Sequence, residues 1–326
     1  MTKSSAPGKI ILFGEHAVVY NRPALAVPVM QVHADVEVLD SPRAGIWINA
    51  PDVDLHAELN TLPSNHPIAS VINDLFPLFH ISPLPSLEIK ITSTIPVASG
   101  LGSGAAVSVA LIRALSLALS EIEGTSIVHP LSDEQVNHFA YEIEKIHHGT
   151  PSGIDNSVIT YARPVYFIKN LPASNNKDTG GIIETFKVGV PFTIVIGDTG
   201  ITALTKESVA DVRKLLRMNQ IHWESVFDEI GQIALMARRA IESGRPDMLG
   251  ELMDQNHTFL QELTVSSPEL DKLVGAARKA GALGAKMSGG GRGGNMIALV
   301  EQDQAEAVAS ALISAGARNV IITKVE

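Results

Sequence analysis

A glycine-rich turn at residues 96–106, PVASGLGSGAA, constrains the fold of this chain more than any other stretch. Before it, residues 87–95 alternate apolar and polar side chains, which predicts a half-buried strand. After it, residues 105–119 form a long run rich in Ala and Leu, which predicts a buried helix. Glycines let the backbone approach a ligand closely, and a helix start offers unpaired N–H groups with a partial positive charge. The turn is therefore a candidate phosphate-binding loop, to which Ser103 could add a hydroxyl.

The sequence of this turn excludes two common nucleotide-binding motifs and leaves a purely structural turn as an alternative. It is not a Walker P-loop, because no Lys-Ser or Lys-Thr follows it. It does not fit a dinucleotide fingerprint, because its third glycine comes too early and no first strand of a βαβ unit precedes it. A tight turn that needs glycine for its geometry alone stays open as an alternative. A phosphate loop without its own lysine would also need a cation from elsewhere in the chain.

The amino-acid composition indicates a globular protein and excludes several kinds of partner and site. The chain has 326 residues, 45% of them hydrophobic and 18% charged, which is enough to bury a sizeable core. Its net charge is −10 and no block of Lys and Arg stands out, which argues against nucleic acid or a membrane as partner. With no cysteine, disulfides and thiolate sites are excluded. We find neither a signal peptide nor an apolar run of about 18 residues, and we expect a cytoplasmic protein.

Strand and helix patterns along the chain predict an α+β fold in two lobes, 1–175 and 176–326. The boundary falls near the polar stretch Asn170–Gly181. Further strands are expected at 10–13, 24–29, 192–196, 296–300 and 320–324, and helices at about 204–280 and 305–315.

Two carboxylates lie close together in the sequence after the glycine-rich turn. Ser132 and Gln135 form a capping box for a helix that ends near Gly149, and Glu144 lies at the flank of its apolar face. Asp155 follows in a predicted loop, GTPSGIDNSV, where it could accept a proton from a hydroxyl substrate. The alternative is that Asp155 only caps a turn together with Asn156.

Two further stretches add candidate groups. In APGKIILFGEHAVVY, Lys9 precedes a buried strand and could supply the missing cation, while Glu15 and His16 follow a glycine turn. A surface lysine and an ordinary polar turn are the alternatives. In SGGGRGG, residues 288–294, the strand that follows at once argues against a linker and favours a loop packed close to backbone or ligand.

Together and in this order, these stretches resemble the three shared motifs of the GHMP kinases over nearly the whole chain: 6–15, 96–106 and 286–294. The segments 6–20 and 144–158 resemble the mevalonate kinases more than the galactokinases or homoserine kinases. The resemblance implies a two-lobed fold: an N-terminal lobe like ribosomal protein S5 domain 2, a ferredoxin-like C-terminal lobe, and an active site in the cleft. It implies ATP, Mg²⁺ and mevalonate as ligands. Another kinase of this fold, acting on phosphomevalonate or a sugar, and a non-catalytic nucleotide-binding regulator remain alternatives.

The resemblance also assigns roles residue by residue. Asp155 corresponds to the catalytic base and Lys9 to the group that polarises the hydroxyl, while Glu144, with Ser103, corresponds to the metal ligands. Glu15, His16 and Thr205 correspond to the substrate side. The ATP loop would comprise Pro96, Ala98, Ser99, Gly100, Leu101, Gly102, Ser103, Gly104 and Ala105.

Two positions depart from the family pattern. Gly104 stands where a second serine is usual, so that Ser103, water or Glu144 must hold the metal. Asn295 stands where a cysteine is usual, a change expected to be harmless. The segment 45–67 is a candidate for part of the adenine pocket, with no residue assigned. The oligomeric state is open, a homodimer being one alternative.

Overall fold

The computed structural model describes residues 1–81, 83–96, 99–122, 125, 127, 129–148, 152–169 and 181–326. It divides into two compact units, each made of several stretches of chain. Unit 1 comprises Met1–Gly8, Val32–Val97 and Gly102–Ala162, and unit 2 comprises Lys9–Gln31, Ala98–Leu101 and Arg163–Glu326. The predicted lobe boundary lies almost wholly in residues 170–180, outside the described part, and stays a prediction.

Unit 1 contains a sheet in the order β4-β3-β5-β2, with β1 beside β2. Its strands are β1 (Thr2–Phe13), β2 (Pro23–Asp40), β3 (Ile46–Ala50), β4 (Leu55–Glu58) and β5 (Leu87–Ser93), of which β1 and β2 also enter unit 2. The alternation predicted for β5 is confirmed, because Leu87, Ile89 and Ile91 are buried while Lys90 and Thr92 are exposed.

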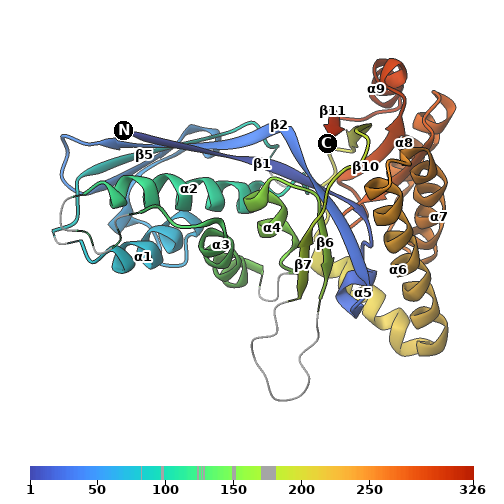
Figure 1. Ribbon diagram of the computed structural model, residues 1–326, viewed down its shortest axis with the longest axis horizontal. Helices are drawn as coiled ribbons and strands as arrows, with labels where there is room; N and C mark the ends of the chain where they lie inside the picture. The colour runs from blue at the N-terminus through green and yellow to red at the C-terminus, as the bar shows by residue number, and fades with distance from the viewer. Residues whose placement is uncertain are drawn as a thin grey trace. The chain divides into compact units, whose positions relative to one another are not determined.

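Four helices of unit 1 gather on one side of these strands (Figure 1). They are α1 (Pro67–Phe79), α2 (Ser103–Ser120), α3 (Asp133–His148) and α4 (Ile154–Tyr161). The buried helix predicted after the glycine turn is α2, whose residues Val109, Leu111 and Leu115 are fully buried. The capping box of α3 is also confirmed: Ser132 N–H donates to Gln135 Oε1 at 2.9 Å, and Gln135 N–H donates to Ser132 Oγ at 3.4 Å.

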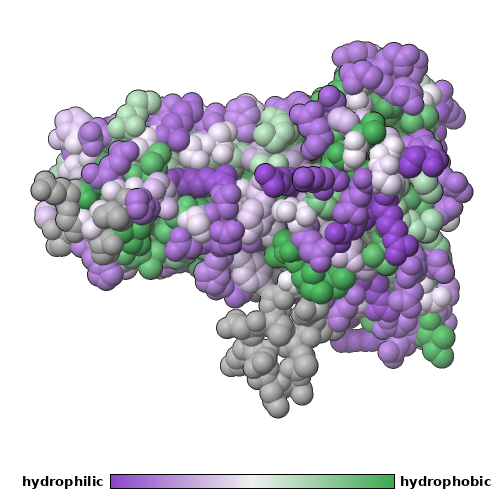
Figure 2. All heavy atoms as spheres, in the orientation of Figure 1, coloured by the Kyte–Doolittle hydropathy of each residue, from purple (hydrophilic) through white to green (hydrophobic). Residues whose placement is uncertain are grey.

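One expectation about α2 needs correction. Its 18 residues are apolar and long enough to cross a membrane by length and composition, whereas no such run was expected. Within the structure 61% of this stretch is buried, as in the core helix of a globular unit. Hydrophilic residues cover most of the face shown in Figure 2, and hydrophobic ones form separate patches there.

Unit 2 is built on an antiparallel four-stranded sheet in the order β11-β8-β10-β9. These strands are β8 (Phe192–Asp198), β9 (Gly284–Ser288), β10 (Asn295–Val300) and β11 (Asn319–Val325). The first half of β2 pairs with β6 (Val165–Ile168), which pairs with β7 (Ile182–Thr185). The helices are α5 (Thr205–Met218), α6 (Gln220–Glu242), α7 (Leu249–Glu262), α8 (Pro268–Lys279) and α9 (Ala305–Ser314), and α6, α7 and α8 run beside the sheet (Figure 1).

Candidate functional site

The glycine turn leaves the start of α2 open to a ligand. Gly100 and Gly102 have φ angles of 80° and 78°, a left-handed backbone that other residues adopt only with strain. Gly102 is the N-cap of α2, and without a side chain it cannot bond the first N–H groups of the helix. These groups and the helix dipole therefore favour an anion at Ser103 and Gly104.

A cavity of about 310 Å³ in unit 1 adjoins this helix start. Ser103 and Gly104 line it together with Asp52, His66 and Ser93, and its other lining residues are mostly apolar. Its size and make-up are those of a small-molecule site with a few orienting polar groups. Asp52 and His66 belong to the segment 45–67, which the sequence could not assign residue by residue.

Glu144 lies beside the same helix start. The side chain projects from α3 and is almost fully buried, and a Cβ placed on Gly104 would lie 3.9 Å from its Oε1. Among the described residues, no three His, Asp or Glu side chains gather to hold a metal alone. Mg²⁺ in nucleotide sites uses one or two carboxylates together with the phosphates, so Glu144, beside Gly104, and Ser103 fit such an ion.

Asp155 occupies the first turn of a helix, not the loop that the sequence predicted. Gly153, with a φ angle of 87°, is the N-cap of α4, and Asp155 is the second residue of this helix. The neighbouring Asn156 donates to Asn137 Oδ1 at 2.6 Å, which ties α4 to α3, the helix that carries Glu144. Asp155 is half-buried, in the first turn of this helix.

Lys9 belongs to unit 2, where it adjoins the middle of the glycine turn. Its backbone N–H donates to Leu101 O at 2.9 Å, and its side chain is only 5% exposed, which argues against the surface-lysine alternative. The two neighbours Ser99 and Gly100 complete the described part of the turn in this unit. Ala98 lies outside the described residues. The approach of Lys9 to Asp155 of unit 1 stays a prediction.

Glu15 forms a buried ion pair that no local sequence pattern indicates. Its Oε1 accepts a hydrogen bond from Nζ of Lys286, which also donates to Met287 O at 2.7 Å. Lys286 is fully buried and Glu15 is almost so. Burial raises the pKa of Glu15 and lowers the pKa of Lys286, and their attraction partly offsets both shifts. The pair joins the turn after β1 to the strand before the glycine segment 289–294.

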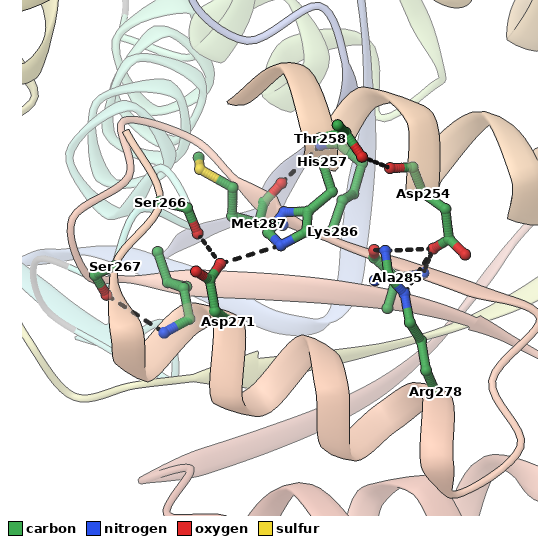
Figure 3. Close-up of polar contacts among 11 residues, drawn as sticks. Asp254, His257, Thr258, Ser266, Ser267, Asp271, Arg278, Ala285, Lys286 and Met287 are labelled. Carbon is green, nitrogen blue, oxygen red and sulfur yellow. Dashed lines mark hydrogen bonds and ion pairs between the residues drawn. The ribbon is translucent and has the colours of Figure 1, made fainter. Parts of the chain in front are cut away.

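Two side chains of α7 hold the strand that carries Lys286. Asp254 Oδ1 accepts the N–H of Ala285 at 2.9 Å, and His257 Nδ1 accepts the N–H of Met287 at 3.3 Å (Figure 3). Because β9 is at the edge of its sheet, these acceptors satisfy N–H groups that β10 does not. On its other side, His257 Nε2 lies 3.2 Å from Asp271 Oδ1. This network fixes the position from which Lys286 reaches Glu15.

His16 lies in a strained turn next to the glycine segment 289–294. It has a φ angle of 62°, a region that costs a non-glycine residue about 1–3 kcal/mol. Its Nε2 lies 3.1 Å from Gly290 O, whereas its buried Nδ1 has no partner among the described residues. Thr205, at the start of α5, also contacts this segment, since a Cβ on Gly290 would lie 2.5 Å from its Oγ1. The predicted substrate residues of unit 2 thus gather at one glycine segment.

Burial of the two histidines predicts acid sensitivity. Desolvation lowers the pKa of His16 and of His257 to about 4, below the usual value near 6.5. Between these values the unfolded chain binds protons that the folded chain does not, so stability falls as the pH drops. We expect a loss of about 2 kcal/mol per histidine between pH 7 and pH 5. Urea unfolding at both pH values measures this loss in the free energy of unfolding. His257→Asn should reduce the pH dependence of that free energy. The same pH dependence in the variant and the wild type would contradict the lowered pKa of His257.

Comparisons with known proteins identify the family and the fold of this chain. Residues 67–163 match the family described as GHMP kinases N terminal domain, and residues 237–318 match GHMP kinases C terminal. The mevalonate kinase of Thermococcus sibiricus is 34% identical over 99% of this chain and 95% of its own. The crystal structure of L. major mevalonate kinase in complex with R-mevalonate superposes with a TM-score of 0.80 at 28% identity, covering 100% of this chain and 96% of that one.

A third relative points the same way. The Methanocaldococcus jannaschii mevalonate kinase is 29% identical over 91% of both chains. Together with the open start of α2 and the three glycine-rich stretches, these matches confirm the predicted family and the mixed α+β fold. The chain belongs to the GHMP kinase family of ATP-dependent small-molecule kinases, and within that family it resembles the mevalonate kinases.

Proposed function

We propose that this chain transfers the γ-phosphoryl group of ATP to the 5-hydroxyl of mevalonate, a step in the synthesis of isoprenoid precursors. The observation that carries the proposal is the start of α2, which presents N–H groups beside a cavity of ligand size. The relatives named mevalonate kinase, similar over nearly the whole chain, supply the acceptor. A cytoplasmic location and a homodimer are part of the proposal, with neither a nucleic acid nor a membrane as partner.

In this proposal the cavity of unit 1 takes the adenosine, and the turn 96–105 takes the phosphates. Asp52 and His66 would orient the base, and Ser103 and Gly104 would face the phosphates. Glu144 and Ser103 would hold Mg²⁺, which neutralises charge on the phosphate oxygens. The N–H groups at the start of α2 and the Mg²⁺ ion would supply local positive potential in a protein whose net charge is −10.

The acceptor alcohol would lie against Glu15, His16 and Thr205. Asp155 would accept the proton of the hydroxyl, and Lys9 would stabilise the charge that develops on the oxygens. Phosphoryl transfer has a loose transition state, so that positioning and electrostatics supply most of the catalysis. His16 would act as a neutral side chain near pH 7, because its pKa is about 4.

The direct test is ATP consumption with mevalonate, phosphomevalonate, galactose and homoserine, followed by the product mass. We expect turnover with mevalonate and a product with one added phosphoryl group on the 5-hydroxyl. Preference for phosphomevalonate or a sugar would reject mevalonate as substrate. Binding of ATP without turnover on any acceptor would favour a regulator on the kinase scaffold.

Gly104 offers a test of the metal site. A Cβ at this position has room, since its nearest neighbour would be Glu144 Oε1 at 3.9 Å. Gly104→Ser would therefore add a hydroxyl ligand beside Glu144, and we expect the Mg²⁺ concentration for half-maximal activity to fall about three- to tenfold, about one hydrogen-bond-sized interaction. Gly104→Ala is the control for backbone stiffening alone. Equal Mg²⁺ dependence of the two variants would exclude this position from the metal site.

A further inference from the structure

The side chain of Asn295 reaches the glycine turn from the far end of the chain. Asn295 is the first residue of β10, directly after the glycine segment 289–294, and it is 2% exposed. Its Nδ2 donates to the backbone O of Ser99 at 2.6 Å. A buried bond this short, between residues 196 positions apart in sequence, fixes the carbonyl direction of Ser99.

Two glycines flank this hydrogen bond at short distances. A Cβ on Gly100 would lie 3.6 Å from Nδ2 of Asn295, and a Cβ on Gly294 would lie 3.9 Å from Ser99 O. At the other end of the same short segment, Leu101 O accepts the N–H of Lys9. Ser99–Leu101 is therefore held at both ends, by a side-chain amide and by β1.

Asn295 lies in a strand that is paired on both sides, next to a hydrogen-bonded glycine. Asn295 pairs with Asp198 of β8 and with Ser288 of β9, on both sides of its strand. Gly294 next to it donates to Ile201 O and accepts from the N–H of Thr199, both at 2.9 Å. A donor held in this way needs no rearrangement when a ligand binds, which is the condition for preorganisation.

We propose that Asn295 is a positioning residue that holds the glycine turn at Ser99 in the conformation that binds ATP phosphates. The identity of the ligand rests on the proposed function. Asn295 acts through the backbone of Ser99, so its loss should weaken nucleotide binding more than binding of the alcohol. The sequence led us to expect that Asn295 is harmless in place of the usual cysteine, and this proposal goes further by giving its side-chain amide a function.

The test measures nucleotide affinity without turnover. In Asn295→Ala the Kd of the Mg²⁺ complex of a non-hydrolysable ATP analogue, measured by calorimetry, should rise about three- to tenfold, the range for losing one hydrogen bond. The KM for mevalonate at saturating ATP should change less than about twofold, well under that range. Thr323→Val is the matched control, since Thr323 is equally buried in the same sheet and its Oγ1 has no partner among the described residues. This control should leave both constants unchanged.

A second variant covers a failure of Asn295→Ala to fold. Asn295→Cys keeps a small side chain but replaces the amide by a weak thiol donor, and it should also raise the Kd. An unchanged Kd in a folded Ala or Cys variant, or equal losses for nucleotide and alcohol, would overturn the proposal. If the wild-type chain binds the analogue but does not phosphorylate mevalonate, the proposed function fails while the Kd comparison still decides the role of Asn295.

Discussion

Asp155→Asn should lower kcat at least about 100-fold while the fold stays intact, the usual scale for loss of a general base. Asparagine has nearly the size of aspartate, and it can occupy the same place in the first turn of α4. Its amide cannot accept the proton of the alcohol, so the chemical step should fail while both substrates still bind. Steady-state kinetics with ATP and mevalonate measure kcat, and circular dichroism checks the fold.

Asp133→Asn is the matched control for this variant. Asp133 lies in the first turn of α3 in the same unit, and its carboxylate pairs with Arg113 at 2.6 Å on the surface. This exchange should leave kcat within about twofold, because an exposed pair contributes little. Near-normal turnover in Asp155→Asn would remove Asp155 from the catalytic groups, and a similar loss in Asp133→Asn would point to a general effect of charge.

Lys286→Met should destabilise the protein by about 3–5 kcal/mol, the range for breaking a buried ion pair on one side. The variant leaves the carboxylate of Glu15 buried without its cation, and Oε2 of Glu15 already has no partner among the described residues. The double variant with Glu15→Gln should recover most of this loss, because it removes both charges together. Urea unfolding of the two variants and the wild type gives the free energies.

Lys324→Met serves as the control for Lys286→Met. Lys324 belongs to the same sheet, but its pair with Glu326 is more than half exposed, so we expect a change below about 1 kcal/mol. If Lys286→Met proved as mild as Lys324→Met, the buried pair would not hold the Glu15–His16 turn in place. If the double variant stayed as unstable as Lys286→Met alone, packing and not charge would explain the loss.

Elements with a strong periodic pattern could be predicted from the sequence. The strand β5, the buried helix α2 and the capped helix α3 each carry their signal within the segment itself. The helix α4 was missed because it has only eight residues and follows glycine and proline, which favour a loop. The first residues of β1, TKSSAPGK, show no alternation, and only pairing with β2 makes them a strand.

In the candidate site too, the sequence indicates residues within motifs but not contacts between distant segments. Motif order singled out Lys9, Glu15, Glu144 and Asp155 as candidates, because each belongs to a stretch that contains a glycine turn. Lys286 was not singled out, since its partner Glu15 is 271 positions away and nothing local marks a lysine as buried. The contact of Asn295 with Ser99 likewise depends on tertiary structure alone.

The passage of β1 and β2 through both units has a consequence for experiments that divide the gene. No single cut separates the two units, because the stretches that make up unit 1 and unit 2 alternate along the sequence. A fragment starting at Arg163 would lack residues 9–31, and with them Ala17 of its hydrophobic core and the carboxylate that neutralises Lys286. Two halves of the chain expressed separately should therefore regain structure only when they are mixed. A circularly permuted chain would need its new termini outside β1 and β2.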